Sequence, residues 1–282
     1  MTPNLLTRLV NVGFALLVAA YLVLPSLVVI PLSFSTSMFL EFPPPGYSTR
    51  WFGEFFADPQ WRDALVRSVV VAACSACIAV PVGLTASFGL LRARGRAGRA
   101  LEPLVMVPMM IPVVISGFGM YVVSLRLDMG GSILLVVLAH AVLALPFVVV
   151  TVTAALRTFD FRLVLAARVS GASPLTAFRK VVLPVIAPAV GAATLIALMM
   201  SLDEAVIATF VAGDTSPTLP VMMFSSITYE LNPLVPVAAT LLTAATGLMI
   251  FAAALLARLG RTRSDIPRDP QEATREHEVA HG

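Results

Sequence analysis

Residues 158–184 read TFDFRLVLAARVSGASPLTAFRKVVLP, a polar and basic stretch between two of the most apolar segments of the chain. Asp160 can cap a short helix, and Gly171 can adopt the left-handed backbone that ends such a helix. Ser173 can then cap a second helix that has Pro174 in its first turn, where a missing N–H costs nothing. The stretch therefore predicts a helix, a glycine bend and a second helix.

The second of these helices is expected to carry an apolar side. Leu175, Phe178 and Val182 follow one another at i, i+3 and i+7, so they share one face. Such a face suits the binding of a soluble partner protein, and it equally suits an amphipathic loop on a membrane surface. The spacing of the residues leaves both interpretations open.

Composition places the chain in a membrane. Of its 282 residues, 58% are hydrophobic and 12% are charged, and the mean hydropathy is +0.92, which excludes an ordinary soluble domain. The apolar residues lie in continuous stretches of about 20, the length of a membrane-spanning helix, so we expect an all-α, polytopic membrane protein. The net charge is only +3 and the basic residues lie in separate loops, so we expect no nucleic-acid partner.

Six stretches are long and apolar enough to cross a bilayer as helices. They cover about residues 10–34, 66–91, 103–125, 133–156, 185–211 and 235–259. Residues 1–259 thus form a transmembrane domain, and the polar residues 260–282 are expected to be a disordered cytoplasmic tail. Between the first two stretches, aromatic side chains alternate with charges, which predicts a helix at the membrane interface: Trp51, Phe52, Phe55, Phe56 and Trp61.

Lysine and arginine are distributed unevenly between the two sides of this arrangement. Of the 19 Lys and Arg residues, 15 fall on the side that holds the chain termini and residues 158–184. The positive-inside rule makes that side cytoplasmic. We therefore expect both termini in the cytoplasm and a multi-pass location in the bacterial cytoplasmic, or inner, membrane.

Residues 158–184 resemble the EAA coupling loop of permease subunits of binding-protein-dependent ABC importers. That pattern is Glu-Ala-Ala, three residues, Gly, nine residues, a branched aliphatic residue, one residue and Leu-Pro. Leu165 stands where the pattern has its Glu. The resemblance implies a type I ABC importer permease fold in which this cytoplasmic loop couples to an ATPase subunit, with these candidate coupling residues: Ala166, Ala167, Gly171, Ala172, Ser173, Pro174, Thr176, Phe178, Arg179, Leu183 and Pro184.

Three further stretches look like the spermidine and putrescine branch of these permeases. They are LAHAVLALPFVVV (138–150), SLDEAVIATFVAG (201–213) and TLPVMMFSSI (218–227). The likeness implies a polyamine or a similar small cation as substrate, although aminoalkylphosphonate, iron and thiamine permeases share the layout. Polyamine relatives often have an acidic residue directly after a proline of the third span, whereas Pro112 is followed here by Val113.

A few residues within the spans are candidates for the substrate pathway. Asp203 and Glu204 could attract a cation, or they could serve as a helix cap or an interhelix hydrogen-bonding group. His140 is expected to bond to a neighbouring helix more readily than to act in a proton relay. Pro112 either belongs to the wall of a translocation path or causes a structural kink.

The chain contains no phosphate-binding loop of the GxxxxGK[ST] type, so ATP hydrolysis must come from another subunit. The expected partners are two ATPase subunits that use ATP and magnesium, a second homologous permease, an extracytoplasmic substrate-binding protein and membrane lipid. We expect no catalytic residue, cofactor or metal site in this chain; Cys74 and Cys77 are interpreted as small helix-packing residues. The alternative function is a secondary transporter driven by an ion gradient, and an intramembrane enzyme is disfavoured because no GxSxG context is present.

Overall fold

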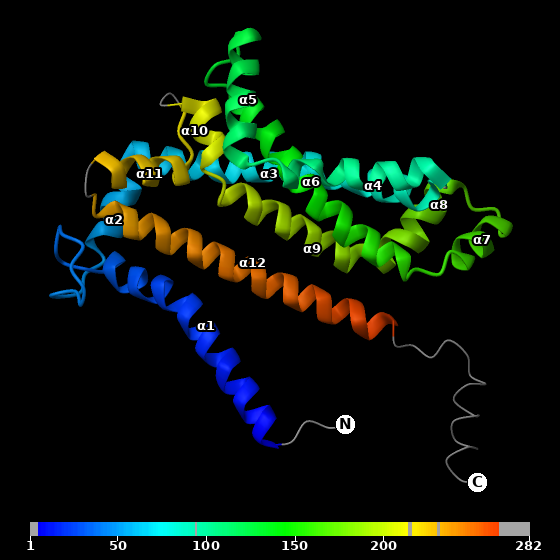
Figure 1. The fold of residues 1–282 in the computed structure, drawn as a ribbon, viewed down its shortest axis with the longest axis horizontal. Coiled ribbons are helices and arrows are strands. Elements are labelled where there is room, and N and C mark those ends of the chain that lie inside the picture. The colour runs from blue at the N-terminus through cyan, green and yellow to red at the C-terminus, as the bar shows by residue number, and fades with distance from the viewer. Residues whose placement is uncertain (1–4, 94, 214–215, 230–231, 265–282) are drawn as a thin grey trace. The chain divides into compact units, whose positions relative to one another are not determined.

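The structure, a computed structural model, describes residues 5–93, 95–213, 216–229 and 232–264 (Figure 1). Apart from an isolated antiparallel bridge between Ser35 and Tyr47, every regular element in these ranges is helical. The predicted all-α class is therefore confirmed. The helices are α1 (Leu5–Ser33), α2 (Arg50–Ala57), α3 (Pro59–Arg92), α4 (Gly95–Met110), α5 (Val113–Arg126), α6 (Ile133–Arg157), α7 (Arg162–Val169), α8 (Pro174–Ala177), the π-helix η1 (Phe178–Val182), α9 (Leu183–Leu202), α10 (Val206–Ala212), α11 (Leu219–Tyr229) and α12 (Leu234–Ser264).

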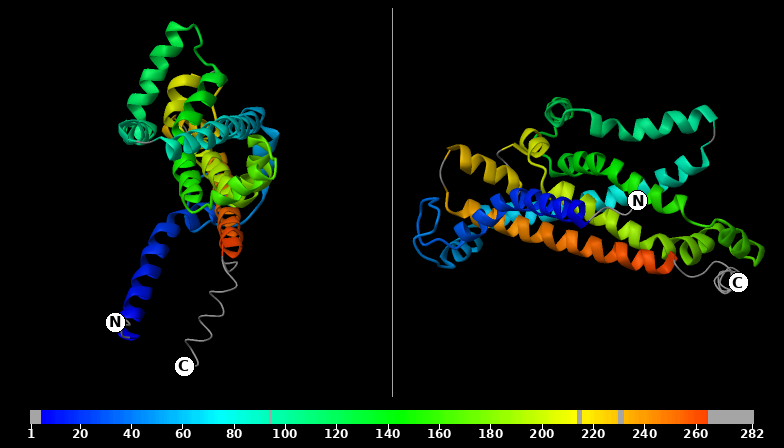
Figure 2. Two further views of the ribbon diagram at one scale, coloured as in Figure 1. Left: turned by 90° about the vertical axis from the view of Figure 1, so that its right-hand side faces the viewer. Right: turned by 60° about the horizontal axis from the view of Figure 1, so that its bottom comes forward.

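Five described helices are long and apolar enough to cross a membrane, and the number rises to six if the bent pair α4 and α5 counts as one span. The third predicted span is interrupted, because the helix stops at Met110 and restarts at Val113. Pro112 removes one backbone donor and disfavours the helical conformation of Ile111, so a break at this point is physically reasonable. Figure 2 shows α12, by contrast, as a continuous helix; it runs to Ser264, and the rest of the predicted tail, 265–282, lies outside the described residues.

The chain divides into two compact units. Unit 1 comprises residues 1–71, 113–136 and 202–247, and unit 2 comprises residues 72–112, 137–201 and 248–282. Several long helices contribute to both units along their length. Each unit has its own apolar core.

The core of unit 1 is built around the aromatic residues of α2 and the start of α3. Trp51, Phe55 and Trp61 are at most 2% exposed, and they pack with apolar residues of α11 and α12 such as Leu219 and Val237. The prediction of an interfacial helix with these rings at the lipid headgroups is therefore wrong for these three side chains. They are instead the core of the unit, because α11 and α12, distant in sequence, cover them.

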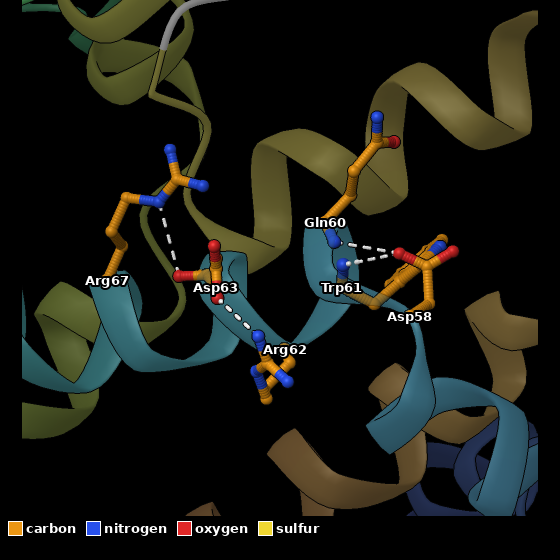
Figure 3. A network of polar contacts seen from close by, with 6 residues as sticks. All are labelled: Asp58, Gln60, Trp61, Arg62, Asp63 and Arg67. Atoms are coloured by element: carbon orange, nitrogen blue, oxygen red, sulfur yellow. Dashed lines mark hydrogen bonds and ion pairs between the residues drawn. The ribbon is translucent and has the colours of Figure 1, made fainter.

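A single residue, Asp58, forms the corner between α2 and α3 (Figure 3). Its N–H donates to the carbonyl of Glu54 and closes α2. Its carboxylate Oδ1 accepts from the N–H groups of Gln60 and Trp61, at 2.7 and 3.3 Å, and so caps α3, whose first residue is Pro59. The cap directs Trp61 into the core, while Arg62 and Asp63 form an exposed ion pair on the opposite side.

The core of unit 2 lies among α3, α6, η1 and α9. Small residues of α3 and α9, such as Ala76 and Ala193, pack with branched residues of α6 such as Val148 and Val152. Serine hydroxyls add hydrogen bonds between α3 and α6: Ser75 Oγ donates to the carbonyl of Val137 at 3.0 Å. Cys74 and Cys77 are exposed on α3, so within this chain they do not pack against a neighbouring helix as the sequence had suggested.

Candidate functional site

The loop between α6 and α9 begins with an aspartate-supported turn. Asp160 Oδ1 accepts from the N–H of Arg162 at 2.9 Å, and the carbonyl of Asp160 accepts from the N–H of Leu163. Phe161, one residue later than expected, occupies the cap position of α7. Asp160 thus stabilises the helix start from just outside the helix.

Gly171 ends α7 in the way the sequence predicts. Its φ angle is +88°, which is accessible to glycine and strained for other residues. The N–H of Gly171 donates to the carbonyl of Arg168, and the N–H of Ala172 donates to the carbonyl of Ala167, each at 3.0 Å. This pair of bonds is a Schellman motif, so the end of α7 satisfies its own backbone carbonyls without a partner.

Ser173 starts the second helix, also as predicted. Its Oγ accepts from the N–H of Thr176 at 3.2 Å, and Pro174 occupies the first helical position. The helix continues as α8 and then widens into the π-helix η1 before α9 begins at Leu183. Both α7 and α8 contact η1, so the loop is one packed piece of unit 2.

The apolar face expected on the second helix is not available as a whole. Val182 is only 3% exposed and belongs to the core of unit 2. Phe178 is half-buried, and its ring makes an edge-to-face contact with Phe88 of α3, with 5.7 Å between centroids. Only Leu175, at 63% exposure, faces outward. The i, i+3, i+7 spacing predicted one exposed apolar face. That prediction is wrong because η1 is a widened turn and its residues pack against the core, including α3.

The first helix, α7, is the exposed one. None of its residues is buried, and Leu165 and Val169 are 65% and 82% exposed. Ala166 is exposed and Ala167 is half-buried. A helix of eight residues that leaves large apolar side chains in the open is typical of a surface that another molecule covers.

The second candidate site is the junction between α9 and α10. The fifth predicted span, 185–211, is not one helix, because α9 ends at Leu202 and α10 begins at Val206. Glu204 Oε1 accepts from the N–H groups of Val206 and Ile207, both at 3.0 Å, and Oε2 accepts from Ala208 at 3.2 Å. Of the two roles left open for Glu204, helix capping is the one observed.

Asp203 differs from its neighbour, because its side chain is exposed. Because α9 ends at Leu202 and α10 begins at Val206, Asp203 and Glu204 lie between two helices and do not project from one continuous helix. The short helix α10 that follows packs on α5, where Gly117 lies so close that a Cβ atom would come within 2.7 Å of Phe210 Cδ2. Glycine at this position permits the close contact between the two helices.

His140 lies inside unit 2 and is 2% exposed. Its Nδ1 is 2.7 Å from Ser201 Oγ, in the last turn of α9. The expected bond to a neighbouring helix is therefore confirmed, and Ser201 is a residue that the sequence analysis missed. The only signal for it was a serine in an apolar run two residues before Asp203.

The remaining candidates are placed as follows. Pro112 is exposed in the break between α4 and α5. No group of three or more His, Cys, Asp or Glu side chains in the described ranges could hold a metal ion. The described residues thus contain two candidate polar regions: the exposed loop 158–184 and the junction 203–205 between α9 and α10.

The sequence matches known families over most of its length. Residues 79–263 match the family described as "Binding-protein-dependent transport system inner membrane component". The spermidine/putrescine transport system permease protein PotC of Escherichia coli (strain K12) is 31% identical over 252 residues, which cover 89% of this chain and 95% of that protein. The putrescine transport system permease protein PotI of the same strain is 34% identical over 264 residues, which cover 90% and 92%.

Solved structures of importers have the same fold. A bacterial alginate ABC transporter in complex with its pentasaccharide-bound periplasmic protein contains a chain that aligns with a TM-score of 0.65 at 13% identity, covering 92% of this chain and 96% of that one. A chain of the MetNI methionine ABC transporter, in an inward-facing conformation, aligns with a TM-score of 0.57 at 22% identity, covering 74% and 97%. At these identities the likeness establishes the fold alone.

Proposed function

The chain belongs to the binding-protein-dependent transport system inner membrane component family, and we propose that it imports a polyamine or a similar small cation, driven by ATP hydrolysis on a separate subunit. As a permease of an ATP-driven importer it forms part of a translocation path. The observation that carries the proposed coupling is the exposure of α7, none of whose residues is buried.

The coupling role is assigned to the loop 158–184. Its central bend is fixed by local hydrogen bonds at Gly171 and Ser173, and η1 is held in the core through Val182. A push on α7 is therefore transmitted to α9 and the core of unit 2 instead of being absorbed by a loose loop. Binding of nucleotide to the ATPase subunits shifts the permease between conformations through this contact.

The proposed substrate class rests on the relatives and on one carboxylate. PotC and PotI are described as permeases for spermidine/putrescine and for putrescine, and each aligns with about nine-tenths of this chain. Asp203 is exposed, whereas the carboxylate of Glu204 is engaged by three backbone N–H groups. We assign Asp203 as the residue that attracts the cationic substrate and Glu204 as a structural cap.

The proposed assembly contains a second homologous permease, two ATPase subunits and an extracytoplasmic binding protein. Support comes from faces that this chain leaves uncovered: the most apolar windows of α1 and α12 are 0% buried within the chain. Helices of that kind require lipid or another apolar helix around them. The uneven distribution of Lys and Arg supports cytoplasmic termini and a cytoplasmic loop 158–184 in the inner membrane.

Uptake by the complete transporter in proteoliposomes tests the substrate and the energy source. We expect spermidine or putrescine uptake that requires ATP and does not respond to a proton gradient. Asp203→Asn is expected to raise the KM for the cation about tenfold or more. The assay control is an unrelated ATP-driven importer, whose rate of uptake of a neutral solute is measured under the same conditions. Uptake that follows the proton gradient would refute the ATP-driven function, and an unchanged KM in Asp203→Asn would refute the role of that carboxylate.

A further inference from the structure

One side of α7 points away from the core of unit 2. Arg162, Leu165, Ala166 and Val169 lie at i, i+3, i+4 and i+7, so they share a face, and all four are exposed. On the other side, Val164 packs against the core. Leu165, which stands in the place of the Glu in the EAA pattern, is therefore part of the outward face, beside Arg162 and Val169.

The charges around this face are predominantly positive. Arg162, Arg168, Arg179 and Lys180 are exposed, and their side chains form no ion pair with any described residue. Asp160 is the one acidic residue in 158–184, and its carboxylate is held by the N–H of Arg162. The loop thus presents four cationic side chains beside exposed apolar residues, against a single carboxylate, that of Asp160.

The arrangement of these residues fits a protein surface better than a lipid surface. A helix that lies on a membrane separates an apolar face from a cationic face. On α7 the apolar and cationic residues share the outward face, so insertion of Leu165 and Val169 between acyl chains would carry Arg162 with them. Mixed faces of this kind, with arginine beside apolar residues, are typical of protein interfaces.

We infer that the outward face of α7 docks on the ATPase subunit at a site with an apolar floor and an acidic rim. Leu165 fills the apolar floor, and Arg162 makes the ionic contact with the acidic rim. A Glu at position 165, as in the EAA pattern, would instead require a basic group on the ATPase subunit. This inference rests on the proposed coupling function and specifies the chemistry of its partner. It reverses the expected sign of the charge on the receiving surface.

The test uses the chain co-expressed with its partner permease and ATPase subunit, purified through a tag on this chain and placed in nanodiscs. Leu165→Glu is expected to weaken binding of the ATPase subunit at least about tenfold, because a carboxylate would be buried on an apolar floor with an acidic rim. Leu163→Glu is the matched control: it adds the same charge to the same helix, two residues away and off the outward face, and should bind normally.

Arg162 is tested by charge. Arg162→Glu is expected to weaken binding by a similar factor, and Arg162→Lys to retain it. Raising the salt concentration should weaken binding of the unaltered chain more than binding of Arg162→Glu, since the ionic contact is screened. Normal binding in both Leu165→Glu and Arg162→Glu, or an equal loss in Leu163→Glu, would overturn the inference.

Two further results separate the alternatives. Ala166→Pro breaks α7 in its middle. Suppose that this variant inserts normally but no longer binds the ATPase subunit, while Leu165→Glu binds it normally. The coupling function then stands and the inference fails. If Ala166→Pro inserts normally and binds the ATPase subunit as before, the proposed coupling function itself fails. An effect of Leu165→Glu that appears only with anionic lipid in the nanodisc would assign the face to the membrane and also overturn the inference.

Discussion

The loop 158–184 and the junction 203–205 both interrupt apolar helices with charged residues, yet they are built in opposite ways. In the loop, the bend is satisfied by the Schellman motif at Gly171 and by the hydroxyl of Ser173, and the basic side chains, which make no such backbone bond, remain exposed. At the junction, the carboxylate of Glu204 is itself the cap of α10. The basic side chains of the loop are therefore exposed to a partner, whereas the carboxylate of Glu204 is committed to the start of α10.

The largest expected effect comes from removing the charged cap. Glu204→Ala leaves the first N–H groups of α10 without their acceptor and is expected to lower the free energy of unfolding by about 2 kcal/mol. Glu204→Gln keeps one acceptor oxygen and should cost less. Thermal unfolding of the purified chain in detergent measures both. Asp203→Asn is the control and should unfold like the unaltered protein; equal destabilisation in Asp203→Asn and Glu204→Ala would erase the distinction between the two acids.

The second effect concerns the loop. Gly171→Ala forces a side chain into a left-handed backbone with φ near +88° and is expected to cost about 1 kcal/mol. We also expect weaker stimulation of the ATPase subunit, because the end of α7 shifts. Gly89→Ala is the matched control, since that glycine lies within α3 with open space around it and should gain helix stability. If Gly171→Ala behaved like Gly89→Ala, the bend would not depend on glycine.

The smallest expected effect concerns the internal bond of α9. Ser201→Ala removes the hydroxyl that lies 2.7 Å from His140 Nδ1 and is expected to cost about 0.6 kcal/mol, a typical value for hydrogen bonds between membrane helices. Ser170→Ala is the comparison, because that exposed hydroxyl bonds only to the carbonyl of Ala166 within its own turn. Unfolding curves that coincide for the two variants would show that the interhelix bond adds nothing measurable.

Much of the loop was predictable because its hydrogen bonds are local. A glycine that ends a helix and a serine followed by proline that begins one act over three or four residues, and both features were found where the sequence placed them at Gly171 and Ser173. The all-α fold followed from the continuous apolar stretches, which are long enough to cross a bilayer as helices.

The errors arose where distant parts of the chain decide the outcome. Trp51 and Trp61 read as interfacial rings, but α11 and α12 bury them. Val182 read as an exposed residue, but it enters a core formed by α6 and α9. The sequence predicted one helix over 185–211, but α9 ends at Leu202. A hydropathy pattern contains no information on hydrogen bonds, so it could not predict that the side chain of Glu204 starts a new helix.

The π-helix η1 also has a consequence for how homologous chains can differ in length. A π-turn holds about one residue more than an α-turn. Deletion of one exposed residue, such as Lys180, would let the segment close into an ordinary α-turn while α8 and α9 keep their orientations. A one-residue deletion within α9 would instead rotate everything after it by about 100°. η1 is therefore a site at which single-residue insertions and deletions can be tolerated beside a loop whose geometry must be kept.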